Sequence, residues 1–271
     1  MKTAIVAFLV SLTASVALGD DDAGGAAPTA PTLTANYSGS VLFLPVADIS
    51  LSAVFPDQTY SAAARFTTAG IAAWFDDTDI EAGVSGYRAA SALRPWRYEH
   101  LNHASSKNRI VGIDFPDGTA MPDINPPFGS MGEPPASDTD RAGAIDPLTT
   151  LLAIISGINP NGARPGGANE EGACEGRFPV FDGKARYDVR LEAGGRDRVR
   201  TSAWRGQALV CRAYLEPISG YDADDRPDAG ETAEPVTMWL APVDGFWVPV
   251  RFRARTEIGQ INIRAQRIQV Q

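Results

Sequence analysis

The chain has 271 residues, 44% of them hydrophobic, which is enough for one large β domain or two small ones. Its formal net charge of −9 argues against a general nucleic-acid partner, because such binding depends on cationic side chains that neutralise phosphates. The 26 glycines and 20 prolines indicate many turns and loops.

Residues 1–19 have the pattern of a secretory signal peptide, with Lys2 before an apolar stretch and the small residues Ala17 and Gly19 at the cleavage site. The apolar stretch is too short for a spanning helix, and no other stretch is long enough. No cysteine follows the cleavage site to carry a lipid anchor. The sequence therefore predicts a protein exported to the periplasm, with no membrane-spanning segment.

Residues 20–35 are acidic and then rich in Ala, Pro and Thr, which predicts a disordered tether. We expect a single antiparallel β domain over residues 36–271. Apolar and polar residues alternate along its first part, as in strands covered on one side. The alternation predicts a long strand or hairpin over 37–55, followed by further strands over 60–67, 78–84, 96–103 and 109–115, and this spacing indicates a meander.

Prolines interrupt this pattern over residues 116–145. Their density excludes a helix interior and a central strand, so the sequence predicts a long loop. A loop of this length is either a lid over a cavity or a surface excursion.

One short helix is expected at about 147–156. Asp146 is a suitable N-cap, Pro147 occupies the first helical position, and Gly157 is placed to end the helix. Its apolar stripe, which should pack on the sheet, is formed by Leu148, Leu151, Leu152 and Ile155.

The clearest strand pattern lies within residues 173–212. Charged and apolar residues alternate over 184–192, so one face should be apolar and the other charged. Asp182-Gly183 precedes this run and predicts a hairpin with a type I′ turn. A second run over 208–214 is expected to pair beside it.

Cys174 and Cys211 are the two cysteines of the chain. Paired, they would close a loop of roughly 40 residues and stabilise the fold by about 4 kcal/mol. Free, they would be two small buried apolar residues. Export favours the disulfide, and the cysteines and histidines have no zinc-site spacing.

Strands are also expected over 236–241 and 247–256, followed by a last strand whose apolar face shifts parity near Gln266-Arg267, as a β-bulge produces. Arg251, Arg253 and Arg255 should share one face. They would either contact an anionic group or an acidic partner, or form a solvated face paired with nearby acids.

No catalytic constellation emerges from the sequence, and we expect neither a metal nor another cofactor. His100 and His103 are an odd number of positions apart on an expected strand, so they should face opposite sides. The segment around Ser85 lacks the second glycine of a nucleophile elbow, because Tyr87 stands there. The acidic segment 220–234 fails as a calcium loop, since Arg226 and Pro227 occupy required positions.

The C-terminal two thirds of the chain resembles the domain-of-unknown-function 3108 family of exported bacterial proteins. The resemblance is carried, in order, by Asp146-Pro147-Leu148, Cys174, Asp182-Gly183-Lys184, Tyr187-Asp188, Cys211, Gly220-Tyr221, Trp239-Leu240, Pro249-Val250 and Gly259. It implies a curved antiparallel sheet or open half-barrel, similar to periplasmic lipoprotein carriers, with a covering helix. It brings no catalytic residues, and fold alone does not settle function.

Two functions follow from these expectations. The first is an exported protein that binds a lipid or other apolar small molecule on the concave face of the sheet. The alternative is a structural or protein-interaction component of the cell envelope, with a filled core and no ligand cavity. An enzyme would need convergent titratable residues, which the sequence does not offer.

Overall fold

The computed structural model describes residues 30–70, 73, 78–89, 91–104, 108–158, 170–224, 234–256 and 259–271. The expected signal peptide and residues 20–29 of the expected tether lie outside the described residues. Most of the acidic segment 220–234 lies outside them as well. The first strand begins at Thr32, so the last four residues of the expected tether are extended sheet.

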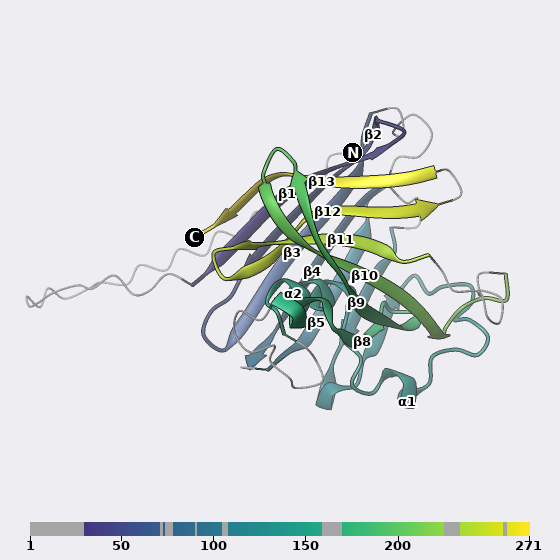
Figure 1. The fold of residues 1–271 in the computed structure, drawn as a ribbon. Coiled ribbons are helices and arrows are strands. Elements are labelled where there is room, and N and C mark those ends of the chain that lie inside the picture. The colour runs from purple at the N-terminus through teal and green to yellow at the C-terminus, as the bar shows by residue number, and fades with distance from the viewer. Residues whose placement is uncertain are drawn as a thin grey trace, which may run out of the picture.

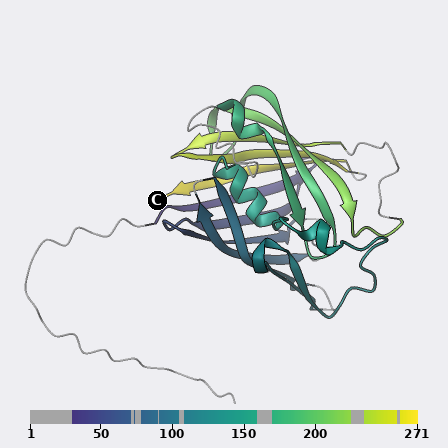
Figure 2. The same ribbon diagram turned by 90° about the horizontal axis from the view of Figure 1, so that it is seen from below.

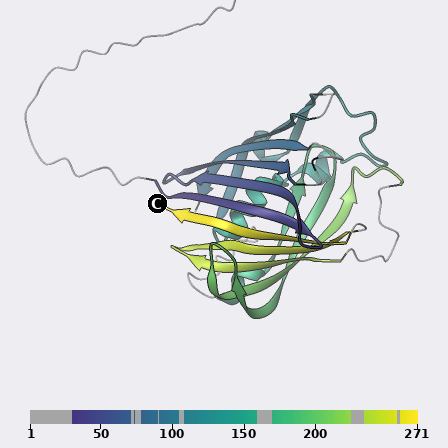
Figure 3. The ribbon, with the colours of Figure 1, turned by 90° about the horizontal axis from the view of Figure 1, so that it is seen from above.

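The described residues form strands β1 (Thr32–Val41), β2 (Leu44–Val54), β3 (Thr59–Thr68), β4 (Asp79–Ala89), β5 (Ala92–Asn102), β6 (Ile110–Asp114), β7 (Met121–Asn125), β8 (Gly176–Phe181), β9 (Arg186–Arg200), β10 (Arg205–Ser219), β11 (Val236–Val243), β12 (Phe246–Thr256) and β13 (Gly259–Val270). They make one antiparallel sheet in the order β7-β6-β5-β4-β3-β2-β1-β13-β12-β11-β10-β9-β8 (Figure 1). Pairing of β1 with β13 joins the first and last strands at the centre of the sheet (Figure 3).

The sheet curves until its edge strands β7 and β8 approach one another without pairing. The predicted class, a mainly β fold with an open half-barrel, is therefore confirmed. Within the described residues, no helix is long and apolar enough to cross a bilayer.

We call the gap between the edge strands β7 and β8 the seam. A short segment, residues 142–145, bridges it. On one side Ala142 forms an antiparallel bridge with Thr119, just before β7. On the other side Ile145 forms a parallel bridge with Val180 of β8, and the backbone N–H of Ile145 donates to Pro179 O at 2.8 Å. The seam is thus sealed locally by a chain segment rather than by a strand pair.

The predicted loop over 116–145 contains regular structure, so that expectation needs correction. It includes β7 and a one-turn helix, α1 (Asp138–Arg141), which begins with a capping box at Ser137. Pro122 lies within β7 and pairs with Ile113 of β6. A proline is tolerated there because β7 is an edge strand and no further strand needs its missing N–H.

The predicted helix is confirmed as α2 (Pro147–Ile155), with Asp146 as N-cap. The Asp146 side chain accepts a hydrogen bond from the backbone N–H of Thr149, and Gly157 follows the helix with a φ of +63°. The helix contacts β4, β5, β8 and β12, which come from both halves of the sheet order. It therefore lies inside the curve of the sheet, as Figure 2 shows.

The predicted hairpin exists, but its turn is not the expected two-residue type I′ turn. Phe181 pairs with Arg186, which leaves a four-residue connection. Asp182 Oδ1 accepts hydrogen bonds from the backbone N–H groups of Lys184 at 2.9 Å and Ala185 at 2.7 Å. The aspartate thus organises a longer loop by side-chain capping, an alternative that Asp offers in turns.

The sequence predicted one apolar and one charged face for β9. The charged face is partly buried in the structure. Arg186 and Asp188 are both buried and form an ion pair, with 2.7 Å between Arg186 Nη1 and Asp188 Oδ1. Arg186 Nε also donates to the Asp140 carbonyl at 2.8 Å. The α1 segment therefore covers this end of the strand.

Two further predictions are confirmed. Cys174, at the end of the 3₁₀ turn Glu170–Cys174, forms a disulfide with Cys211 of β10. The parity shift in β13 is a bulge, because Asn36 pairs with Arg267 while Tyr37 pairs with Ala265. The extra residue, Gln266, keeps the apolar side chains of β13 on one face.

Candidate functional site

The concave face of the sheet is largely filled by α2. Leu152 and Ile155 of the helix are fully buried in one cluster with Phe55, Tyr60 and other residues from strands on both sides of the sheet. The space in which an apolar ligand was expected is therefore occupied by the protein itself. Ligand-sized space remains beside the C-terminal end of the helix.

A cavity of about 700 Å³ opens at the seam, and we call it the seam pocket. Its volume falls in the ordinary range for small-molecule sites. It is lined by Tyr87, Ala92, Leu93, Arg94, Pro95, Trp96, Phe115, Asp117, Gly118, Gly143, Ala144, Ile145, Ala153, Ile158, Phe178 and Pro179. These residues come from the β4–β5 end, the β6–β7 connection, segment 142–145, α2 and β8.

The rim of the seam pocket carries two exposed aromatic rings. Tyr87 is 61% exposed and Trp96 is 39% exposed. Their ring centroids are 4.6 Å apart in an edge-to-face arrangement. The floor reaches the main hydrophobic core at Leu93, Ala153 and Phe178. The lining thus includes both exposed rings at the rim and buried apolar residues beside the helix.

Arg94 and Asp117 are the charged residues of the lining. Arg94 is exposed and lies directly across the β4–β5 ladder from Tyr87. Among the described residues it makes no ion pair, so its guanidinium is available to a ligand. A guanidinium binds carboxylate or phosphate oxygens in a fork geometry. The arrangement can hold an apolar molecule that carries an acidic group.

A buried polar cluster lies at the other end of α2. Thr149 Oγ1 donates to Asp146 Oδ2 at 2.6 Å, and it lies 2.8 Å from the Tyr60 hydroxyl. Burial raises the pKa of the Asp146 carboxyl to about 6, although the hydrogen bonds from Thr149 oppose that shift. Burial is also the main cause of the raised pKa of Tyr60. Because Asp146 is fully buried, this cluster fixes the helix rather than meeting a substrate.

A second hollow, of about 430 Å³, lies on the outer face of β2, β3, β4 and β5. It is open and shallow, and its lining includes Ser52, Ser61, Ser85 and the charged residues Arg97 and Glu99. Arg97 is already paired with Glu99 at 3.0 Å and Asp114 at 2.9 Å. This hollow offers little enclosed apolar surface, which leaves the seam pocket as the better candidate.

A family model described as "Protein of unknown function (DUF3108)" matches residues 33–266. The chain belongs to this family. Among curated proteins, no relative matches it. A solved β-barrel-like protein from Brucella abortus, of the domain of unknown function DUF1849, is similar in structure, with a TM-score of 0.53 over 90% of this chain and 98% of that one. At 10% sequence identity, this likeness shows the fold alone.

The structure of this DUF3108 protein separates the three predicted arginines. Arg251 and Arg253 lie over the Trp239 ring, with 4.7 and 5.2 Å from guanidinium carbon to ring centroid. Arg255 instead forms an ion pair with Glu234 at 2.7 Å. Arg264 of β13 pairs directly with Arg251. The sequence did not indicate Arg264, because only the strand register brings it beside the others.

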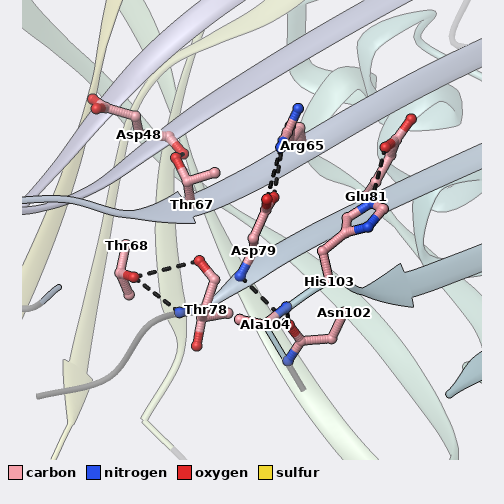
Figure 4. Close-up of polar contacts among 10 residues, drawn as sticks. All are labelled: Asp48, Arg65, Thr67, Thr68, Thr78, Asp79, Glu81, Asn102, His103 and Ala104. Atoms are coloured by element: carbon pink, nitrogen blue, oxygen red, sulfur yellow. Dashed lines mark hydrogen bonds and ion pairs between the residues drawn. The ribbon is translucent and has the colours of Figure 1, made fainter. Parts of the chain in front are cut away.

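The two histidines of this DUF3108 protein do lie apart. His100 is partly buried beside Tyr98, with 5.7 Å between ring centroids, and burial lowers its pKa. His103 is exposed, and its Nε2 lies 3.2 Å from Glu81 Oε2 (Figure 4). Within the described residues, no group of three or more potential metal ligands occurs.

Sequence reasoning missed the seam pocket in this DUF3108 protein. Tyr87 and Trp96 lie on strands whose existence was predicted, but nothing in their spacing marks them as a rim. The pocket is lined by residues of both β5 and β8, which are far apart in the sequence. Only the curvature of the whole sheet brings them together.

Proposed function

We propose that this protein is an exported binding protein for an apolar small molecule with an acidic group, such as a lipid, held in the seam pocket. The observation that carries the proposal is the cavity of about 700 Å³, lined by apolar and aromatic side chains beside Arg94. Sites of this kind combine apolar walls with a few polar groups that orient the ligand.

Each part of the pocket has a distinct role in the proposal. The apolar floor at Leu93, Ala153 and Phe178 receives the apolar part of the ligand, where its burial from water provides most of the affinity. The rings of Tyr87 and Trp96 flank the entrance. Arg94 binds the acidic group at the mouth, where this group stays close to water.

Native mass spectrometry of the protein purified from an oxidising compartment, followed by solvent extraction, tests this function. We expect extra mass of lipid size that solvent releases. Ala153→Phe places a ring in the pocket and should remove that mass. Ala63→Phe, at an exposed position on the outer face of β3, is the matched control and should retain it.

A fluorescence titration with 1-anilinonaphthalene-8-sulfonate provides a second measurement, because this probe combines an apolar ring system with an acidic group. Binding should weaken in Ala153→Phe and in Arg94→Gln, and it should be unchanged in Ala63→Phe. A bare mass, together with equal probe binding by Ala153→Phe and Ala63→Phe, would refute the proposal. That combined result would favour the alternative function, an interaction component of the cell envelope.

A further inference from the structure

The turn between β1 and β2 exposes three large apolar residues. Val41 pairs with Leu44, so Leu42 and Phe43 form a two-residue turn. Leu42 is 72% exposed, Phe43 is 99% exposed and Leu44 is 48% exposed. We call residues 42–44 the apolar tip. Single exposed apolar residues are ordinary, but three consecutive ones at a protruding turn are an interaction feature.

The backbone of the apolar tip is strained as well as exposed. Leu42 has a φ of +48° and Phe43 a φ of +72°, in the left-handed region that bulky residues avoid. Turns of this geometry strongly prefer Asn-Gly, which removes both the strain and the apolar surface. Strained residues that persist at an exposed site point to function.

The tip stands on a rigid base formed by the ends of β2, β3 and β4. Ala69 N–H donates to Val46 O at 3.0 Å, beside the turn. Arg65 binds the Asp79 carboxylate through two nitrogens, at 2.8 and 2.7 Å, and Thr68 exchanges hydrogen bonds with Thr78 (Figure 4). These contacts tie β2, β3 and β4 together beside the turn and pair the Asp79 carboxylate with a guanidinium.

A cationic surface lies just behind the apolar tip. Val41, next to the tip, pairs with Ile261 of β13. Arg253 of β12 pairs with the next residue of β13, Asn262. Arg251 pairs with Arg264, two residues further from the tip. Measured along the strand direction at about 3.3 Å per residue, these arginines lie about 3 to 10 Å behind Val41, on the next two strands, β13 and β12. Within the described chain, none of the three forms an ion pair with a carboxylate.

The arginines repel one another in the free protein. Arg251 and Arg264 are like charges directly across an antiparallel ladder, an unfavourable arrangement. Burial, followed by the nearby charges of Arg253 and Arg264, lowers the pKa of Arg251. Anionic groups brought to this surface would relieve the repulsion.

We propose that the apolar tip docks on a lipid bilayer surface, with Leu42, Phe43 and Leu44 in the interface and Arg251, Arg253 and Arg264 against anionic headgroups. Apolar side chains beside basic residues are the features that bind proteins to anionic membrane surfaces. The tip lies at one end of β2 and the seam pocket lies near the other, so β2, at 11 residues, separates them by roughly 30 Å. The surface thus shares no residue with the seam pocket.

Vesicle flotation with the full purified chain tests the proposal. The probes are vesicles of phosphatidylcholine alone and of phosphatidylcholine mixed with phosphatidylglycerol. We expect the protein to float with both and to partition more strongly with the anionic vesicles. The decisive variant is Leu42→Asn/Phe43→Gly, which installs the preferred turn residues and should keep or raise the midpoint of thermal unfolding. Its partitioning should fall by more than ~10-fold.

In Arg253→Gln/Arg264→Gln, partitioning onto anionic vesicles should fall about fivefold for each arginine removed. Binding to neutral vesicles should be nearly unchanged. Arg94→Gln removes one exposed arginine beside the seam pocket, away from the tip, and should change partitioning much less than the loss per arginine expected at Arg253 and Arg264. Tyr87→Ser/Trp96→Ser removes exposed rings from the seam pocket and should float normally. Failure of the full chain to float, or normal flotation of the Asn-Gly variant, would overturn the proposal.

Discussion

Asp146 caps α2 through Thr149, whose backbone N–H donates to Oδ1 at 2.8 Å and whose hydroxyl donates to Oδ2 at 2.6 Å. Both residues are buried inside the curved sheet. The cap therefore does more than begin the helix, because it places a carboxyl group in the apolar interior beside Tyr60. Stability should depend on the protonation of this group.

Burial raises the pKa of Asp146 to about 6, above its ordinary value of 3.8. The native state therefore binds more protons than the unfolded state between about pH 4 and pH 6. Asp146 should make the free energy of unfolding fall as pH rises through this window, by up to about 3 kcal/mol. Urea unfolding at a series of pH values measures this slope.

Asp146→Asn should remove that part of the slope, because the amide does not titrate and still offers one oxygen to the Thr149 N–H. Asp57→Asn, at an exposed position, serves as the control and should leave the slope in place. An unchanged slope in Asp146→Asn would show that other groups dominate the pH dependence.

The hydroxyl of Tyr60 anchors the helix to β3. It lies 2.8 Å from Thr149 Oγ1, and Tyr60 is almost completely buried. Tyr60→Phe should lower the free energy of unfolding by about 1 kcal/mol, since it removes one buried hydrogen bond while keeping the ring. Tyr214→Phe, on β10, is the matched control and should change stability less. Equal losses in both variants would contradict this role for Tyr60.

The disulfide ties the chain before β8 to β10 across 37 residues of sequence. Cys174→Ser/Cys211→Ser should lower the free energy of unfolding by about 4 kcal/mol, because the unfolded chain regains the freedom of that loop. Urea unfolding of the wild type with and without a reducing agent gives an independent value. Coincident curves under the two conditions would show that the bond contributes nothing to stability.

Much of the fold could be predicted because its rules are local. Strands follow from alternation, α2 follows from Asp146 and Gly157, and the bulge at Gln266 follows from a parity shift in the last strand. Each of these signals lies within a few residues of sequence. The disulfide needed only the presence of two cysteines and the expectation of export.

The other features could not be predicted from the sequence. Some depend on contacts between segments that are distant in the sequence, and others on residues that are unusual for the local structure they adopt. Ile145 reaches Val180 only after the sheet has curved, so neither the seam nor its pocket is visible in the sequence. Leu42 and Phe43 are poor turn residues, and the predicted long strand or hairpin therefore had no marked turn. The conventional Asp-Gly turn lies at Asp244-Gly245, whereas the predicted one at Asp182-Gly183 is a longer loop.

Gly220 provides a test of how the chain packs beside the seam. It has a φ of +84°, and a Cβ there would lie 2.0 Å from the Lys184 carbonyl oxygen. Its N–H also donates to Pro134 O at 2.9 Å, so it joins the end of β10 to the segment before α1. Gly220→Ala must displace backbone on both sides.

Gly195 is the matched control for this substitution. Its φ is +86°, but a Cβ there would meet nothing within 4 Å. Gly195→Ala should cost roughly 1–2 kcal/mol from backbone strain alone. Gly220→Ala should cost clearly more, because the steric clash adds to the same strain. Urea unfolding of the two variants measures the difference, and equal losses would mean that the close approach at Lys184 relaxes without cost.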